Sequence, residues 1–343
     1  MHTGDGHAPG LDRALAILDR HDLDVARQLR AWCRVVLGEP ASPAPWHHTR
    51  LNTRPEPVEL SLGCPDGGLR ATFDLSGRCA TPSERLAQAL ACIQEAAPRA
   101  HVPGGAVATF SALQHDRPLT WGAWLGVRWR ADGTVRAKVY VEVPRSMPPD
   151  EIDRWLHAWL GRRPPTPPEA RLLLVGGTPG DATCECYFEC RRGTHAVHWG
   201  CWSDWDRLLR EAGIDGEAQG VFPLMRRFDG REPRREQAPA AAWIGYSLAG
   251  TPDGAIHAAA VLATAARLAG GEAGLRHQVL SLAGRQGDGL PLYDALTAPL
   301  RNLHRADGFH NILSCSAAPG AAAGWQMAFC PPHAAASVSQ EPS

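Results

Sequence analysis

Lysine is nearly absent from this sequence: of its 35 Lys and Arg residues, only Lys138 is a lysine. Arginine cannot replace lysine where a compact, strongly hydrated ammonium is needed instead of a planar guanidinium. Lys138 is therefore a candidate functional residue, and the alternative is a chance lysine on the surface. Tyrosine is also scarce, and three of the four, Tyr140, Tyr187 and Tyr246 but not Tyr293, fall in segments with strand character.

Other absences exclude whole classes of protein. No apolar stretch approaches the roughly 20 residues of a membrane-spanning helix, and the polar start Met1–Gly10 lacks the features of a secretory signal. The formal net charge of -1 gives no overall field that would attract nucleic acid or an anionic membrane. The ten cysteines are scattered, which predicts reduced thiols and a cytoplasmic protein.

A repeated hairpin pattern is present instead. Five Pro/Gly-rich turns each separate two segments with the apolar alternation of strands covered on one face. The predicted pairs are Val58–Gly63 with Leu69–Leu75, Trp121–Arg130 with Val135–Val143, Arg171–Val175 with Thr183–Arg191, Ala242–Leu248 with Ala255–Ala263, and Phe309–Ser316 with Trp325–Cys330. The third turn is placed at Gly176–Asp181.

Helical patterns lie before and between the hairpins. One of them begins after Thr81, a residue type that caps helices well. The predicted helices are Leu11–Leu18, Leu23–Val36, Pro82–Ala97, Pro149–Leu160, Ser203–Ala212, Leu275–Leu282 and Leu292–Leu303. The basic segment Arg226–Arg235 is interpreted as a solvated loop.

Ten antiparallel strands with helices between the hairpins predict an α+β fold in which a closed ten-stranded β-barrel is jacketed by α-helices. Residues 1–50 would supply N-terminal helices of the jacket, residues 51–332 the barrel, and residues 333–343 a disordered tail. The alternative is two separate α+β domains divided at Arg162–Pro168.

The segment Val135–Val143 indicates which side chains would line the barrel. Its odd-numbered residues are apolar and would pack on the helices, while Arg136, Lys138, Tyr140 and Glu142 share the other face. On an open sheet that face would simply be solvated. In a jacketed barrel it points into the lumen and forms a binding surface for an anion beside an aromatic group.

Three segments carry a resemblance to a known family. The runs Pro57–Ser61, Leu69–Phe73 and Arg136–Tyr140, the last followed by Pro144, resemble the indole prenyltransferases of the dimethylallyltryptophan synthase type. The resemblance is carried by about residues 55–145 and implies the barrel of ααββ repeats found in that family. It also implies transfer of a prenyl group from an allylic diphosphate to an aromatic acceptor, either an indole-like small molecule or an aromatic residue of a peptide.

The resemblance assigns roles to individual residues. Glu59 would accept a hydrogen bond from the acceptor and help to remove its proton. Lys138 would be catalytic and, with Arg70 and Arg136, would grip the prenyl diphosphate. Cationic residues would hold the prenyl diphosphate and tyrosines would shield the allyl group. These substrate-binding residues are Arg70, Arg128, Arg136, Tyr140, Tyr187 and Tyr246.

No DDxxD-like acidic run is present, although metal-dependent isoprenoid synthases use one to hold diphosphate through Mg²⁺. We therefore expect basic side chains to hold the diphosphate and no metal or other cofactor to take part. The expected protein is a monomer or a homodimer without nucleic-acid or membrane partners.

The chain departs from the family pattern in the third hairpin. Where the family has Arg-x-Lys-x-Tyr, this sequence has Thr183, Glu185 and Tyr187. The tyrosine is kept, but both cations are lost, and Glu185 would repel a diphosphate unless it is paired, for which Arg128, Arg130 and Arg136 are candidates.

Two alternatives remain open. The residues Cys184, Cys186, Cys190, His195, His198 and Cys201 form a dense run that is a candidate zinc site, but their spacing matches no common zinc finger. The first three would also share the helix-facing side of a strand, where buried thiols are ordinary. A catalytically degenerate barrel that binds a hydrophobic or peptide ligand is the other alternative.

Overall fold

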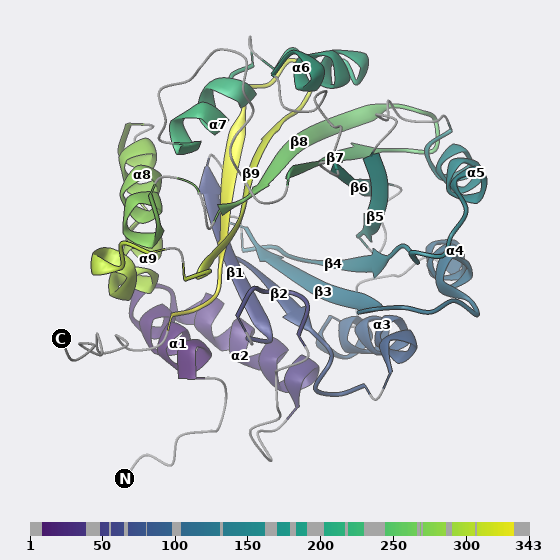
Figure 1. Ribbon diagram of the computed structural model, residues 1–343. Coiled ribbons are helices and arrows are strands. Elements are labelled where there is room, and N and C mark those ends of the chain that lie inside the picture. The colour runs from purple at the N-terminus through teal and green to yellow at the C-terminus, as the bar shows by residue number, and fades with distance from the viewer. Residues whose placement is uncertain are drawn as a thin grey trace, which may run out of the picture.

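A computed structural model gives the architecture of the protein (Figure 1). It describes residues 9–38, 49–54, 56–64, 68–79, 81–97, 104–130, 133–161, 170–178, 183–190, 202–216, 219–229, 244–265, 268, 270–285, 290–305 and 307–332. The predicted tail at 333–343 and the predicted domain linker at 162–168 lie outside these residues.

Ten strands form a closed antiparallel barrel in which each strand pairs with its neighbours in sequence and β1 pairs with β10. The strands are β1 (Val58–Cys64), β2 (Arg70–Asp74), β3 (Ala123–Trp129), β4 (Val135–Glu142), β5 (Ala170–Gly177), β6 (Cys184–Cys190), β7 (Ile244–Gly250), β8 (Ile256–Thr264), β9 (His310–Ala317) and β10 (Gly324–Phe329). All five predicted hairpins are confirmed. Because β4 also pairs with β5, a single sheet joins the two halves of the chain, and the two-domain alternative is wrong.

The helices surround the barrel (Figure 1). They are α1 (Pro9–His21), α2 (Leu23–Leu37), the 3-10 helix η2 (Pro82–Glu84), α3 (Arg85–Ala96), α4 (Gly104–Gln114), α5 (Pro149–Leu160), α6 (Trp202–Glu211), α7 (Val221–Asp229), α8 (Glu272–Arg285), α9 (Pro291–Leu296) and the 3-10 helix η4 (Ala298–Asn302). None of those that the structure describes has the length and apolar character needed to cross a bilayer.

Local signals explain where the predicted helices begin. The side chain of Asp22 accepts a hydrogen bond of 3.0 Å from the backbone N–H of Val25, which caps α2. At the expected Thr81 position, the carboxylate of Glu84 accepts a hydrogen bond of 3.0 Å from the Thr81 backbone N–H.

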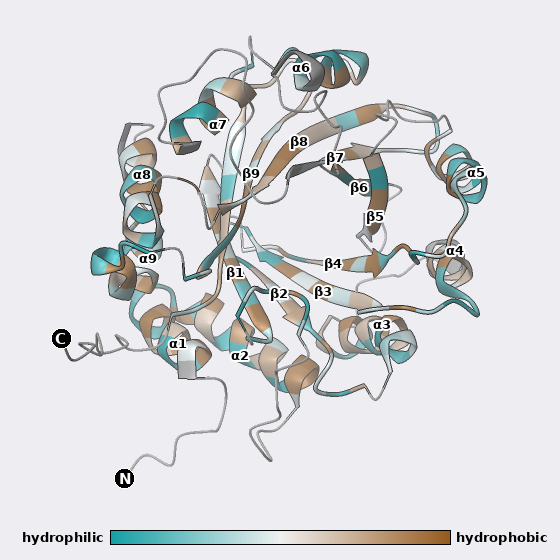
Figure 2. Ribbon diagram, in the orientation of Figure 1, coloured by the Kyte–Doolittle hydropathy of each residue, from teal (hydrophilic) through white to brown (hydrophobic). Residues whose placement is uncertain are grey.

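The main apolar core lies between the helices and the outer face of the barrel. On β4, Ala137, Val139 and Val141 are buried in this layer, as the alternation predicts. Lys138 and Tyr140, between them, are only partly buried and face the lumen. Hydrophobic and hydrophilic residues alternate in bands along several strands (Figure 2). The strands therefore present an apolar outer surface and a mixed inner one.

Two expectations about local structure are wrong, and one helix was missed. Gly176 and Gly177 belong to β5 and not to the turn after it. Helix α4 was not predicted, because its small and apolar residues have no clear helical stripe. The basic segment predicted as a loop begins inside α7, which includes Arg226 and Arg227, while residues 230–235 lie outside the described chain.

Candidate active site

The barrel encloses a cavity of about 890 Å³ that is lined by residues from all ten strands. Of the eight predicted site residues, seven line it: Glu59, Arg70, Arg128, Arg136, Lys138, Tyr140 and Tyr187. The sequence pattern therefore predicts correctly that these seven side chains face the cavity.

Tyr246 is the exception, and its predicted inward orientation is wrong. The next residue on β7, Ser247, lines the cavity, so Tyr246 points outward. Its ring is fully buried, stacks on Phe188 at 4.6 Å between centroids and meets Trp205 of α6 edge-on at 6.0 Å. Strand β7 carries apolar residues on both faces, so its sequence does not show which of its residues face inward.

Three arginines lie in register across neighbouring strands at one level of the lumen. Arg70 on β2 is the partner of Arg128 on β3, and Arg128 is the partner of Arg136 on β4. Positive charges directly opposite one another form a surface to which a multivalent anion is attracted. Guanidinium groups bind phosphate oxygens in pairs of parallel hydrogen bonds. We refer to these three residues as the arginine row.

Lys138 lies two residues further along β4 and is held by two groups of β6. Its Nζ forms an ion pair with the carboxylate of Glu185 and donates a hydrogen bond of 3.0 Å to the Tyr187 hydroxyl. The second oxygen of Glu185 accepts a hydrogen bond of 2.6 Å from the Ser247 hydroxyl. The partner of the carboxylate is therefore the lone lysine, a pairing that the sequence did not predict.

The charges of this pair stabilise each other. Burial disfavours the ammonium form of Lys138, but the Glu185 carboxylate more than offsets this and raises the lysine pKa. Burial likewise disfavours the carboxylate, yet Lys138 and the hydroxyl donors hold the pKa of Glu185 below its usual range. Burial and the neighbouring Glu185 raise the pKa of Tyr187 well above its usual range, so its phenol stays protonated.

Glu59 of β1 lies in a different environment. The side-chain amide of Asn311 donates a hydrogen bond to its carboxylate. Burial raises the Glu59 pKa to about 7, although the hydrogen bond from Asn311 opposes the shift. A carboxyl group that titrates near neutral pH is well suited to accept a proton from a substrate.

Two aromatic pairs also line the cavity. The rings of Tyr140 and Tyr187 meet edge-on at 5.9 Å, and Lys138 Nζ lies 5.0 and 5.2 Å from their respective centroids. Trp121 and Trp124 are stacked at 3.8 Å with an interplanar angle of 14°. Such faces attract cations and apolar groups, and a tyrosine pair beside a cationic region can accommodate a carbocation next to its leaving anion.

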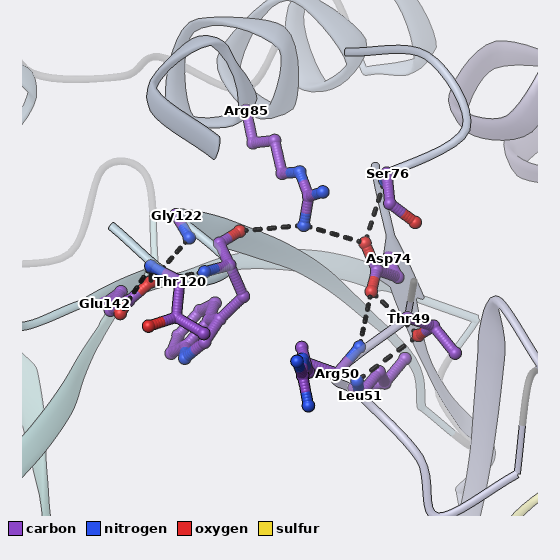
Figure 3. A network of polar contacts seen from close by, with 10 residues as sticks. Thr49, Arg50, Leu51, Asp74, Ser76, Arg85, Thr120, Gly122 and Glu142 are labelled. Atoms are coloured by element: carbon purple, nitrogen blue, oxygen red, sulfur yellow. Dashed lines mark hydrogen bonds and ion pairs between the residues drawn. The ribbon is translucent and has the colours of Figure 1, made fainter. Parts of the chain in front are cut away.

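Glu142 ends the polar column of β4 but has a structural role. Its carboxylate accepts hydrogen bonds from the backbone N–H groups of Thr120, Trp121 and Gly122 at 3.0, 2.6 and 2.7 Å (Figure 3). The side chain thereby holds the segment that carries Trp121 against the end of the barrel.

Asp74 holds a second segment at the same end. It accepts hydrogen bonds from the Thr49 hydroxyl and the Arg50 backbone N–H at 2.7 and 3.1 Å (Figure 3). Arg85 of α3 bridges the two segments, since one of its nitrogens contacts Asp74 at 3.3 Å and the Trp121 carbonyl at 3.0 Å. The two buried carboxylates therefore fix the position of cavity-lining groups.

The candidate zinc run is only partly described. Cys184, Cys186 and Cys190 are buried on the outward face of β6, away from the lumen. His195, His198 and Cys201 lie outside the described residues. Within the part of the chain that the structure covers, no group of three or more His, Cys, Asp or Glu side chains could hold a metal ion.

Sequence reasoning missed four groups that complete the cavity: Trp121, Trp124, Ser247 and Asn311. The alternation of inward and outward residues along β3 and β9 could have predicted that Trp124 and Asn311 face the cavity. Ser247 has no sequence signal, because the phase of β7 was unknown. Trp121 lies just before β3. Its position in the cavity depends on the hydrogen bond that its backbone N–H donates to Glu142.

Comparison with solved structures shows the fold. No family model matches the sequence, and no curated protein matches it significantly. The chain is similar to 5-dimethylallyl tryptophan synthase from Streptomyces coelicolor in complex with DMASPP and Trp, with a TM-score of 0.76 and 15% identity over 99% of this chain and 98% of that one. It is similar to 6-dimethylallyltryptophan synthase from Micromonospora olivasterospora in complex with DMASPP and Trp, with a TM-score of 0.72 and 16% identity over 95% and 97%. NotF in complex with brevianamide F and DMSPP gives a TM-score of 0.61 and 14% identity over 96% and 95%.

Proposed function

We propose that this chain, which has the prenyltransferase barrel fold, transfers a prenyl group from an allylic diphosphate to an aromatic acceptor inside its lumen. The observation that carries the proposal is the arginine row, which lines the same cavity as a tyrosine pair and a carboxyl group of raised pKa. The neighbours solved with DMASPP and Trp support both classes of substrate.

The proposed reaction breaks the bond between the allylic carbon and the diphosphate oxygen, and the electron pair leaves with the diphosphate. Arg70, Arg128 and Arg136 would stabilise this anion by charge-assisted hydrogen bonds. The faces of Tyr140 and Tyr187 would stabilise the allylic cation, at about 0.5–2 kcal/mol for each ring. Excluding water is equally important, because water would capture the cation.

The aromatic acceptor then attacks the cation, and a new carbon–carbon bond forms. The ring regains its aromaticity when the carbon at the point of attack loses its proton. Glu59 is the proposed acceptor of this proton, and Asn311 holds its carboxylate in place.

The proposal includes a reaction without a metal ion. The role of a metal in diphosphate chemistry is to neutralise the leaving anion, and three guanidinium groups in register can do the same. This expectation rests on the arrangement of the arginines and on the lack of an acidic DDxxD-like run in the sequence.

The test is incubation of the purified protein, with EDTA present, with dimethylallyl or geranyl diphosphate and a panel of acceptors. The panel contains tryptophan, other indoles, tyrosine derivatives, brevianamide F and Trp-containing peptides. A prenylated product by mass spectrometry, together with stoichiometric diphosphate release, is the expected result. Activity that appears only after Mg²⁺ addition would contradict the metal-independent mechanism.

A binding barrel without catalysis is the second candidate, and the presence of Glu185 in the lumen favours it. Calorimetry separates the two. Binding of an aromatic ligand together with no binding of diphosphate and no product across the panel would support this candidate.

A further inference from the structure

The cationic groups of the lumen occupy two levels of the same wall. The arginine row is at the level of Arg136, and Lys138 is two residues further along β4. At 3.4 Å per residue, the two levels are separated by about 7 Å along the strand. The positive charge of Arg70 opposes the rise in the Lys138 pKa, so the two levels adjoin, and they differ in that Lys138 contacts Glu185.

The Lys138 level is already neutral. The ammonium group pairs with Glu185 and donates to Tyr187, while Glu185 also accepts from Ser247. About a quarter of each charged side chain is exposed, 23% for Lys138 and 24% for Glu185, and both residues line the cavity. Separating a pair of this kind leaves two uncompensated charges in a poorly solvated site.

A glycine makes this pairing possible. Gly176 of β5 lies between Tyr140 of β4 and Glu185 of β6. A Cβ atom at Gly176 would be 2.4 Å from Cε of Lys138 and 3.0 Å from its Nζ. The lysine side chain therefore crosses β5 through space that any other residue would fill.

We propose that Glu185 is a specificity-determining residue that keeps Lys138 paired and thereby confines an anionic diphosphate to the arginine row. This inference rests on the proposed function and refines it, because it assigns the diphosphate to Arg70, Arg128 and Arg136. It departs from the expectation drawn from the family resemblance, in which Lys138 also grips the diphosphate. A diphosphate that approached Lys138 would also approach the Glu185 carboxylate, and juxtaposed like charges are strongly unfavourable.

The experiment measures the affinity for inorganic diphosphate by calorimetry, which does not require turnover. It compares the wild type with Glu185→Gln, with the double variant Lys138→Met/Glu185→Gln and with Ser247→Ala. Glutamine keeps the size of the side chain and its hydrogen-bonding oxygen but removes the charge. The double variant has the same net charge as the wild type, and Ser247→Ala removes a contact of Glu185 without changing any charge. Circular dichroism confirms the fold of each variant.

We expect Glu185→Gln to bind diphosphate about tenfold or more tightly, because the freed ammonium adds a charge-assisted contact. The affinity of the double variant for diphosphate should stay within about threefold of the wild-type affinity. It replaces an ion pair that does not contact diphosphate with two uncharged side chains. Ser247→Ala should also stay within about threefold of the wild type.

Three results would overturn the inference while leaving the proposed function intact. One is wild-type affinity in Glu185→Gln, and another is a loss of tenfold or more in the double variant, which would make Lys138 a direct diphosphate ligand. The third is an equal gain in Ser247→Ala. A complete lack of diphosphate binding in all four proteins would instead contradict the proposed function itself.

Discussion

Lys138 reaches Glu185 across the full width of strand β5, because the glycine between them has no side chain. A second glycine serves the adjacent tyrosine. A Cβ atom at Gly126 of β3 would be 2.8 Å from Cε2 of Tyr140. Lys138 and Tyr140 thus both occupy space along the barrel wall that side chains at these two positions would fill.

Alanine at Gly176 should destabilise the protein and disrupt the ion pair. The new Cβ would overlap the lysine side chain, and overpacking of this kind typically costs about 1–3 kcal/mol. Gly284→Ala is the matched control, because nothing lies within 4 Å of its Cβ position and alanine favours the α8 helix by up to about 1 kcal/mol. Denaturant unfolding of both variants checks this, and equal stability would contradict the close contact.

Glutamine at Glu59 should lower the prenylation rate by about 100-fold or more, because the base that accepts the ring proton is lost. The wild type should also show a characteristic pH profile. The Glu59 pKa is raised to about 7, so below that pH the group is mostly protonated and cannot accept a proton. The rate should therefore rise with pH up to about 7 and level off above it. A Glu59→Gln variant that keeps the same acidic limb would show that another group titrates.

Glutamine at Arg128, the central residue of the arginine row, should weaken diphosphate binding by about 10- to 100-fold, the range for a lost charge-assisted contact. Arg154→Gln is the control for loss of a positive charge, since Arg154 pairs with Asp150 on the exposed face of α5. Calorimetry with inorganic diphosphate measures both. Equal losses in the two variants would indicate an effect of net charge alone.

Tyr246 and Tyr187 should respond to substitution in opposite ways. Tyr246→Ala should reduce stability by about 3–5 kcal/mol, because its fully buried ring packs on Phe188 and Trp205. Tyr187→Phe should leave stability nearly unchanged but lower turnover, because its hydroxyl contacts Lys138 inside the cavity. Thermal unfolding and product formation, measured on both variants, separate the two roles. A stable but inactive Tyr246→Ala would place that ring in the reaction after all.

The sequence predicted the barrel well because two local signals agree at four of the five hairpins. Alternation with a period of two marks the strands, and a Pro/Gly-rich turn separates them. The same signals failed where they conflicted: Gly176 and Gly177 have the composition of a turn but lie in β5, since the adjacent Lys138 and Phe110 side chains need the space.

Site residues were predicted correctly only on strands where polar and apolar residues alternate clearly. β4 alternates strictly, and its inward residues were assigned correctly, whereas β7 is apolar on both faces and Tyr246 was assigned to the wrong one. The pairing of Lys138 with Glu185 joins side chains 47 positions apart. It depends on which strands neighbour each other and on a glycine between them, and no local pattern carries that information.

The two faces of β4 divide the protein's tasks by the parity of residue number. Ala137, Val139 and Val141 bury apolar groups against the jacket, whereas Arg136, Lys138 and Tyr140 at even positions face the cavity. Mutational drift at these inward positions can change what the lumen accommodates while the outer layer keeps the ring of strands closed. Chains with this architecture can therefore diverge in chemistry until little sequence likeness remains, and a laboratory library restricted to inward positions would explore new acceptors with few misfolded members.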